Sequence, residues 1–102
     1  MVQAIENGTD IRCTILQRGP SASLPDYDEL SVTVDAATPV AGLADLISQR
    51  VADNLDLLVP RRLLPDGDLA RWQLSCRARL AGPGIYMAET DPPPERFQLT
   101  PP

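Results

Sequence analysis

The side chains that could do chemistry in this sequence are carboxylates, arginines and two cysteines. The 102-residue chain contains no histidine and no lysine, and all nine of its basic residues are arginines. Without histidine there is no Ser-His or Cys-His nucleophile pair, no imidazole metal ligand and no imidazole to act near neutral pH. Catalysis through carboxylates alone remains open, so the composition argues against an enzyme without excluding one.

Two acidic pairs are the candidates for general acid–base chemistry or for binding a hard cation. Asp26 and Asp28 stand in one segment, and Asp66 and Asp68 flank a glycine in another. The second pair lacks the distant glutamate of a calcium loop, and aspartate is also a common turn residue. We interpret both pairs as turn residues and expect no catalytic residue, no metal site and no cofactor.

The stretch from Thr38 to Leu58 is the element around which the rest of the chain should be arranged. Thr38 suits a helix N-cap, Pro39 suits the first helical position, and Pro60 suits the end of a helix. Apolar residues recur at spacings of three and four, which is typical of one face of an amphipathic helix. These residues are Val40, Leu43, Leu46, Ile47, Val51, Leu55 and Leu58. The pattern predicts one long helix over about 39–58.

Alternating apolar and polar residues predict strands on both sides of this helix. The apolar positions of each strand should face the core. The predicted strands are 11–16, 30–35 and 72–80, with shorter ones at 85–87 and 96–99. The remaining segments are an extended lead at 1–10, a loop at 17–29, a turn at 82–84, a Pro-rich loop at 88–95 and a short tail at 100–102. We see no repeat and predict a single domain over 1–102.

Two strands, a helix that crosses one sheet face, and then further strands predict an α+β fold of the β-grasp type. The sheet would be mixed and four- to five-stranded, with the first and last strands side by side and parallel at its centre. The last strand would then separate Cys13 from Cys76 by about two strand spacings, roughly 10 Å. A disulfide requires less than about 7 Å between Cα atoms, so we predict that both cysteines are reduced core residues.

The chain resembles the ubiquitin-like (β-grasp) protein family over roughly residues 11–99. Leu30–Asp35, running into Thr38-Pro39-Val40, resembles the family's second strand and helix start, and Arg79–Ile85 resembles its Ala-Gly hairpin. The chain ends in Thr100-Pro101-Pro102 rather than in Gly-Gly. The resemblance therefore implies a non-conjugated member, such as the small ubiquitin-like proteins of type VII secretion systems, and a bacterial source.

Strand alternation places several arginines on the open face of this predicted sheet. The expected partner-binding residues are Arg12, Arg77, Arg79 and Arg96, with Leu16 as an apolar contact beside them. Because arginine pairs bidentately with carboxylates, we expect a non-enzymatic protein-interaction module whose partner carries an acidic segment. The alternative is a merely solvated sheet face.

Net charge and the N-terminal sequence limit the partners and the compartment. A net charge of −5 argues against nucleic-acid binding. The sequence shows neither a signal-peptide pattern nor an apolar run long enough to span a membrane, so a cytoplasmic location is expected. The oligomeric state stays open.

Two other functions remain open at this point. One is a ubiquitin-like modifier that is conjugated through an atypical C-terminus. The other is a small acidic inhibitor or immunity-type protein that blocks a basic surface. Its candidate residues are Asp26, Asp28, Glu29, Asp45, Asp53 and Asp56.

Overall fold

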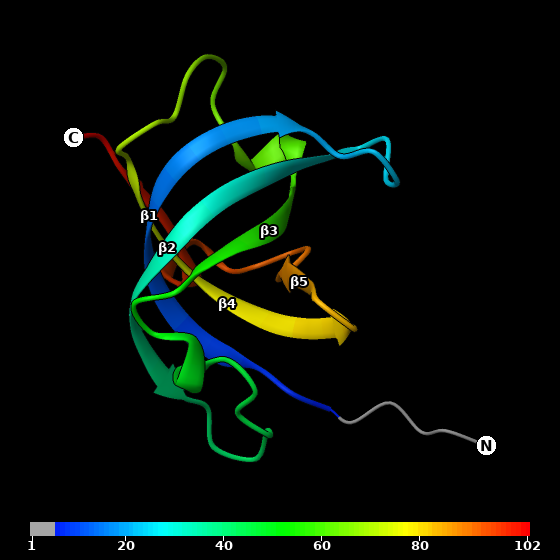
Figure 1. Ribbon diagram of the computed structural model, residues 1–102, viewed down its shortest axis with the longest axis vertical. Helices are drawn as coiled ribbons and strands as arrows, with labels where there is room; N and C mark the ends of the chain where they lie inside the picture. Colours follow the sequence, from blue (N-terminus) through cyan, green and yellow to red (C-terminus); the bar gives the residue numbers. More distant parts are fainter. Residues whose placement is uncertain (1–5) are drawn as a thin grey trace.

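The computed structural model describes residues 6–102, and these residues form strands and short 3-10 turns without any α-helix (Figure 1). The predicted α+β fold is therefore wrong. The strands are β1 (Thr9–Pro20), β2 (Tyr27–Pro39), β3 (Asn54–Pro60), β4 (Gln73–Gly82), β5 (Ile85–Ala88) and β6 (Phe97–Thr100). The 3-10 turns are η1 (Ser48–Arg50), η2 (Arg61–Leu63) and η3 (Pro94–Arg96). No helix of the described part is long and apolar enough to cross a membrane.

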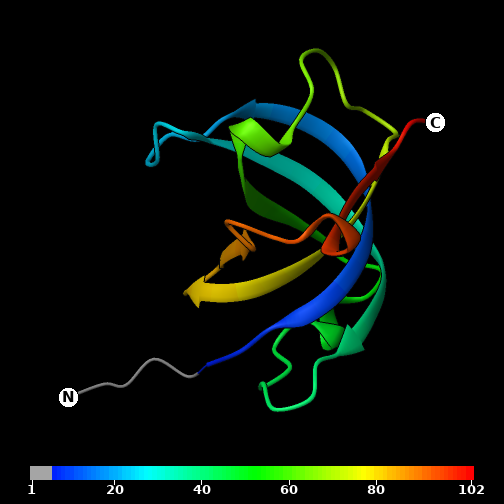
Figure 2. The ribbon, with the colours of Figure 1, turned by 180° about the vertical axis from the view of Figure 1, so that it is seen from behind.

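The strands close into a barrel. β1 pairs with β2 along one edge and with β4 along the other, so the order β1-β2-β3-β5-β4 returns to β1 (Figure 1). Every pairing in this ring is antiparallel except that of β3 with β5, which is parallel. β6 lies outside the ring and pairs with the first half of β4 (Figure 2). This connectivity is that of a five-stranded Greek-key barrel of the OB type.

Three of the predicted strands form with the predicted inward face. Small barrels fill their interior with the side chains that alternate inward along each strand. The inward residues are Ile11, Cys13 and Ile15 of β1, Leu30, Val32 and Val34 of β2, and Leu74, Cys76 and Ala78 of β4, and all are buried. β1 and β2 are longer than predicted, so the loop between them shrinks from 17–29 to 21–26. The turn at 82–84 and the short strands β5 and β6 also form.

The predicted helix over 39–58 is wrong. Thr38 and Pro39 end β2, where they pair with the start of β1, and the second half of the stretch is strand β3. In β3 the apolar residues alternate: Leu55, Leu57 and Val59 face the core, whereas Asn54 and Asp56 face outward. The helical pattern had omitted Leu57, which is fully buried.

The physical reasons for this outcome are local breakers and tertiary pairing. Gly42 has φ +85° and Ala52 has φ +74°, and both values interrupt a right-handed helix. Between them, Asp45 accepts hydrogen bonds from the backbone amides of Ile47 and Ser48, at 3.2 and 3.0 Å, and starts the tight turn η1. β3 then pairs with β2 from Tyr27↔Pro60 to Thr33↔Asn54, so sheet pairing overrides a weak helical preference.

Two connecting segments close the ends of the barrel. Residues 40–53 cover one end and residues 61–72 cover the other (Figure 1). Each segment contributes a fully buried side chain, Ile47 in the first and Leu69 in the second. Leu64 belongs to the same core cluster, and Leu63 packs against it.

The strand neighbours also differ from the β-grasp expectation. β1 and β6 do not pair, because β4 lies between them. The ubiquitin-like arrangement is therefore overturned by the closed ring of strands and by the absence of a long helix from residues 6–102. Residues 1–5 of the predicted lead lie outside the described residues, and its last two residues, Thr9 and Asp10, belong to β1.

Asp45 gives this fold a predictable response to acid. The neighbouring Ser48 side chain, the Thr9 hydroxyl at 2.7 Å and the two backbone amides lower the pKa of Asp45 to about 2. A depressed carboxylate pKa stabilises the folded state above the unfolded-state pKa, and this contribution is lost as pH falls through the folded-state pKa. We expect Asp45→Ala to lower the free energy of unfolding by about 1–2 kcal/mol near pH 6.

The difference between the wild type and Asp45→Ala should shrink between about pH 4 and about pH 2, because the wild-type carboxylate becomes protonated there. Urea unfolding of both proteins at a series of pH values measures this difference in the free energy of unfolding. Asp66→Ala is the matched control, because Asp66 is exposed. A pH-independent difference would show that Asp45 acts through packing rather than through its charge.

Candidate functional site

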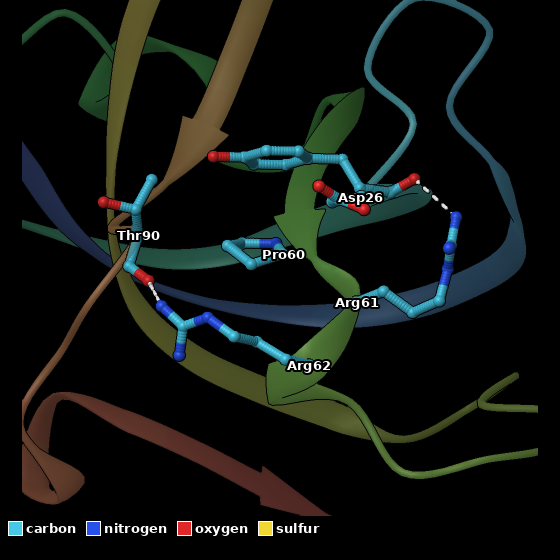
Figure 3. Close-up of a pocket in the computed structure, with 6 residues that line it drawn as sticks. Asp26, Pro60, Arg61, Arg62 and Thr90 are labelled. Atoms are coloured by element: carbon cyan, nitrogen blue, oxygen red, sulfur yellow. Dashed lines mark hydrogen bonds between the residues drawn. The ribbon is translucent and has the colours of Figure 1, made fainter.

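A cleft of about 520 Å³ lies at the end of β3, on the outer wall of the barrel (Figure 3). It is bounded by the start of β2, the beginning of η2 and the residues that follow β5. Its lining residues are Asp26, Tyr27, Pro60, Arg61, Arg62 and Thr90. Pockets of roughly 300–1,000 Å³ are the usual size for ligand sites.

Strand alternation explains why Tyr27 and Pro60 line the outside. Asp28 and Leu30 face into the barrel from β2. Tyr27, the first residue of β2, therefore faces outward. Tyr27 is the register partner of Pro60, which is buried at the last position of β3. Proline has no backbone N–H to donate to a neighbouring strand, and it is tolerated at the end of a strand because no such hydrogen bond is required there. The two rings form an apolar floor for the cleft.

Arg61 is held rigidly beside this floor. Its Nε donates to Asp28 Oδ1 at 2.9 Å, its Nη2 donates to the Tyr27 carbonyl at 3.2 Å, and its backbone amide donates to the Asp26 carbonyl at 2.9 Å. The other carboxylate oxygen of Asp28 accepts from Arg18 Nε at 2.8 Å. Arg18 in turn donates to the Gly67 carbonyl at 2.9 Å. The network ties the loop 21–26 to the start of η2 and to the following loop.

Asp28 is the one acidic residue of this network, and its carboxylate is almost completely buried. Burial acts to raise its pKa, but the hydrogen bonds and the positive charges of Arg61 and Arg18 outweigh burial and lower the pKa of Asp28 below its ordinary value. Asp28 is therefore ionised at neutral pH. Two guanidinium groups share this single negative charge, and the exposed carboxylate of Asp26 lines the same cleft.

Arg62 lies on the opposite side of Pro60 from Arg61 (Figure 3). One Nη2 hydrogen bond reaches the Thr90 carbonyl, and Asp91 Oδ1 lies 3.8 Å from the same nitrogen. Both side chains of that ion pair are exposed, so it contributes little. Within residues 6–102, the Nε and Nη1 groups of Arg62 make no hydrogen bond to protein, and this edge of the guanidinium is open to a ligand.

A row of outward side chains crosses the barrel next to the cleft. The register pairs Glu29 with Leu58, Leu58 with Met87, and Met87 with Arg79. Leu58 is buried although it does not belong to the core cluster inside the barrel. The outer wall therefore carries an apolar strip over β3 and β5, with Arg79 at its far side.

We call the predicted partner-binding residues Arg12, Arg77, Arg79, Arg96 and Leu16 the arginine flank. Arg12 and Leu16 lie on β1, Arg77 and Arg79 lie on β4, and Arg96 ends the 3-10 turn η3. β1 and β4 are neighbours, and Arg12 is opposite Ser75 while Arg77 is opposite Asp10. Arg12 and Leu16 are both exposed on the outer face of β1. The structure thus places four of the five residues on two neighbouring strands of the barrel, whereas Arg96 lies in η3 and not on the predicted last strand.

Neighbouring carboxylates neutralise two residues of the arginine flank. Arg77 Nε donates to Asp10 Oδ1 at 2.9 Å, and Arg96 Nε donates to Glu89 Oε1 at 2.9 Å. The hydrogen bond from Arg96 lowers the pKa of Glu89, which keeps this acid ionised. These pairs leave the arginine flank less suited to an acidic partner than its four arginines suggested, and its role in binding stays a prediction.

The acidic residues of the inhibitor hypothesis do not form one surface. Asp28 is buried between two arginines, and Asp45 is engaged in the loop 40–53. Asp68 accepts the Ala70 amide at 2.9 Å, which confirms its reading as a turn residue. Among the residues described, no group of three or more acidic or cysteine side chains is arranged to hold a metal ion.

Both cysteines are free and buried, as predicted, but the reason given for it is wrong. β1 pairs directly with β4, and the register Cys13↔Leu74 and Ile11↔Cys76 makes the cysteines diagonal neighbours on adjacent strands. Burial, with a smaller effect of Asp35, raises the pKa of Cys13 to about 12, and burial also raises the pKa of Cys76. Neither thiol is therefore a nucleophile at neutral pH.

Of the residues that line the cleft, only Asp26 was a candidate from the sequence. The available signal was the Arg61-Arg62 pair directly after Pro60, because adjacent arginines at the end of an apolar segment are held next to a buried strand. Tyr27 lies in the segment that was predicted as the loop 17–29. Comparison with models of protein families, with curated proteins and with solved structures found no match for this chain.

Proposed function

We propose that this chain is a non-enzymatic binding module and that the cleft receives an acidic, extended segment of a partner protein. The observation that carries the proposal is the pair of guanidinium groups of Arg61 and Arg62 on either side of the Tyr27–Pro60 floor (Figure 3). Guanidinium groups bind carboxylates with two parallel hydrogen bonds. An aromatic ring beside a proline suits an extended, proline-containing backbone.

The rigidity of the cleft supports the same proposal. Arg61 is fixed by Asp28, by the Tyr27 carbonyl and by its own backbone amide, so little conformational freedom is lost when a ligand binds. The two cysteines are buried with raised pKa values, and the chain has no histidine that could activate the Thr90 or Tyr27 hydroxyl of the cleft. Both facts favour recognition over catalysis.

An oligonucleotide is the ligand that OB-type barrels commonly bind on the face of β2 and β3. Here the outward positions of these strands carry Glu29, Asp35 and Asp56, which repel a phosphate backbone. This charge argues against an oligonucleotide on the face of β2 and β3. The free, buried cysteines fit a reducing compartment, and we propose the cytoplasm.

The proposal is tested by selecting a phage-displayed library of random twelve-residue peptides on the immobilised protein. We expect the selected sequences to be enriched in aspartate and glutamate. Their affinity for Arg62→Glu should fall at least tenfold, because that variant replaces a favourable charge pair with a repulsive one. Arg12→Glu is the matched control, since Arg12 is an exposed arginine without an ion pair in the described part of the chain.

Unchanged binding to Arg12→Glu together with weakened binding to Arg62→Glu would support the cleft. The reverse pattern would place the site on the arginine flank and overturn the proposal. A selection that enriches no acidic sequence would overturn it as well.

A further inference from the structure

We infer that the ligand segment continues beyond the cleft, across β5, into a second hollow over β4, where Arg79 binds a second acidic residue. The inference rests on the proposed function and adds the length and the charge pattern of the ligand. The link between the two hollows is Thr90, which lines both of them. The second hollow has a volume of about 200 Å³ and lies beside Arg77, Arg79 and Glu89.

Arg79 is the cation of the second hollow that is available to a ligand. Arg77 is held by Asp10, and Glu89 is held by Arg96, so these charges are already compensated. Arg79 is exposed and forms no ion pair with any described residue; its closest polar contact is a long one, 3.8 Å from Nη2 to the sulfur of Met87. An incoming carboxylate therefore gains a charge pair here without displacing another one.

An apolar side chain stands next to Arg79 on the outer wall. Leu58 and Met87 are register partners on the outer faces of β3 and β5, and Met87 is the register partner of Arg79 on β4. Leu58 is buried and Met87 is half-buried. A segment that runs from the cleft to Arg79 therefore passes Thr90, which lines both hollows, and reaches Arg79 beside the half-buried Met87 side chain.

Strand spacing sets the distance between the two acidic residues of the ligand. The cleft lies over the end of β3 and the second hollow lies over β4, two strands away, which corresponds to about 10 Å. A polyproline II segment rises about 3.1 Å per residue and returns to the same face every third residue. Acidic residues at positions i and i+3 of such a segment are therefore about 9 Å apart and point to the same side.

The experiment uses three acetylated and amidated six-residue peptides and measures dissociation constants by NMR titration of the isotope-labelled protein. The first peptide, Pro-Glu-Pro-Pro-Glu-Pro, has the required spacing. The second, Pro-Pro-Glu-Glu-Pro-Pro, has the same composition and charge with the wrong spacing. The third, Pro-Glu-Pro-Pro-Pro-Pro, has one acid. We expect the first peptide to bind about fivefold more tightly than either of the others.

Arg79→Ala should weaken the first peptide about fivefold and leave the one-acid peptide unchanged, whereas Arg62→Ala should weaken both. Arg12→Ala is the control and should change neither. If Arg62→Ala weakens all peptides while Arg79→Ala and the spacing have no effect, the second hollow is not used and the proposed function stands. If no arginine of either hollow affects binding, or if none of the peptides binds, both ideas are wrong.

Discussion

Replacement of Asp28 by alanine is expected to lower the free energy of unfolding by about 3 kcal/mol, because it leaves two guanidinium groups without their shared carboxylate. Asp28 is 5% exposed, and the Arg18 side chain beside it is only 15% exposed. The Arg61 side chain is 48% exposed and can turn to solvent, which keeps the expected loss near the lower end of the range for broken buried ion pairs.

Urea unfolding monitored by the fluorescence of Trp72 measures this loss. Asp26→Ala is the matched control, because Asp26 is an exposed aspartate two residues away whose side chain makes no ion pair within the described region; we expect it to change stability by about 0.5 kcal/mol or less. The Asp28 variant should also bind the peptides more weakly, since Arg61 loses its anchor. A loss similar to that of Asp26→Ala would show that the network does not stabilise the fold.

Replacement of Leu57 by alanine should cost about 3 kcal/mol, whereas the same replacement at Leu46 should cost about 1 kcal/mol. Leu57 is fully buried at the centre of β3, and Leu46 is half-buried in the loop that precedes it. A truncated core leucine loses its transfer free energy and leaves a cavity in a barrel that has no other side chain to fill it. The helical pattern predicts the opposite ranking, because it places Leu46 on the buried stripe and omits Leu57.

Chemical denaturation of the two variants compares the same chemical change at two positions, so the ranking does not depend on the absolute values. A larger loss for Leu46→Ala would contradict strand β3. Circular dichroism of the wild type offers an independent check. Because the described residues form no α-helix, the spectrum should lack the minima that are typical of α-helices.

The strands with regular alternation were predictable, and the segment before β3 was not. In β1, β2 and β4 every second residue is apolar, and this pattern has one interpretation. Between Val40 and Leu58 the apolar residues recur at spacings of three and four, as in a helix, but they belong to a loop that is followed by a strand. The glycine at position 42 and the alternation of Leu55, Leu57 and Val59 were the contrary evidence, because glycine is unfavourable inside a helix and alternation is typical of a strand.

The candidate site was harder to predict, because it depends on which strands become neighbours. Arg12, Arg77 and Arg79 alternate with inward residues in the sequence, whereas the pairing of Arg77 with Asp10 and of Arg96 with Glu89 follows from the barrel register and from the return of the 89–96 segment. The cleft combines the start of β2, the end of β3 and the residues after β5. Nothing in the local sequence indicates that these three places meet.

The closing of β1 onto β4 has a consequence for the chain as it leaves the ribosome. β1, β2 and β3 can pair with one another as soon as they are synthesised, but the second edge of β1 has no neighbour until β4 emerges, and the second edge of β3 waits for β5. During this interval a curved three-stranded sheet exposes two unpaired edges and an uncovered apolar face. Such surfaces are templates for intermolecular strand pairing, so the nascent half-barrel is the species most exposed to aggregation.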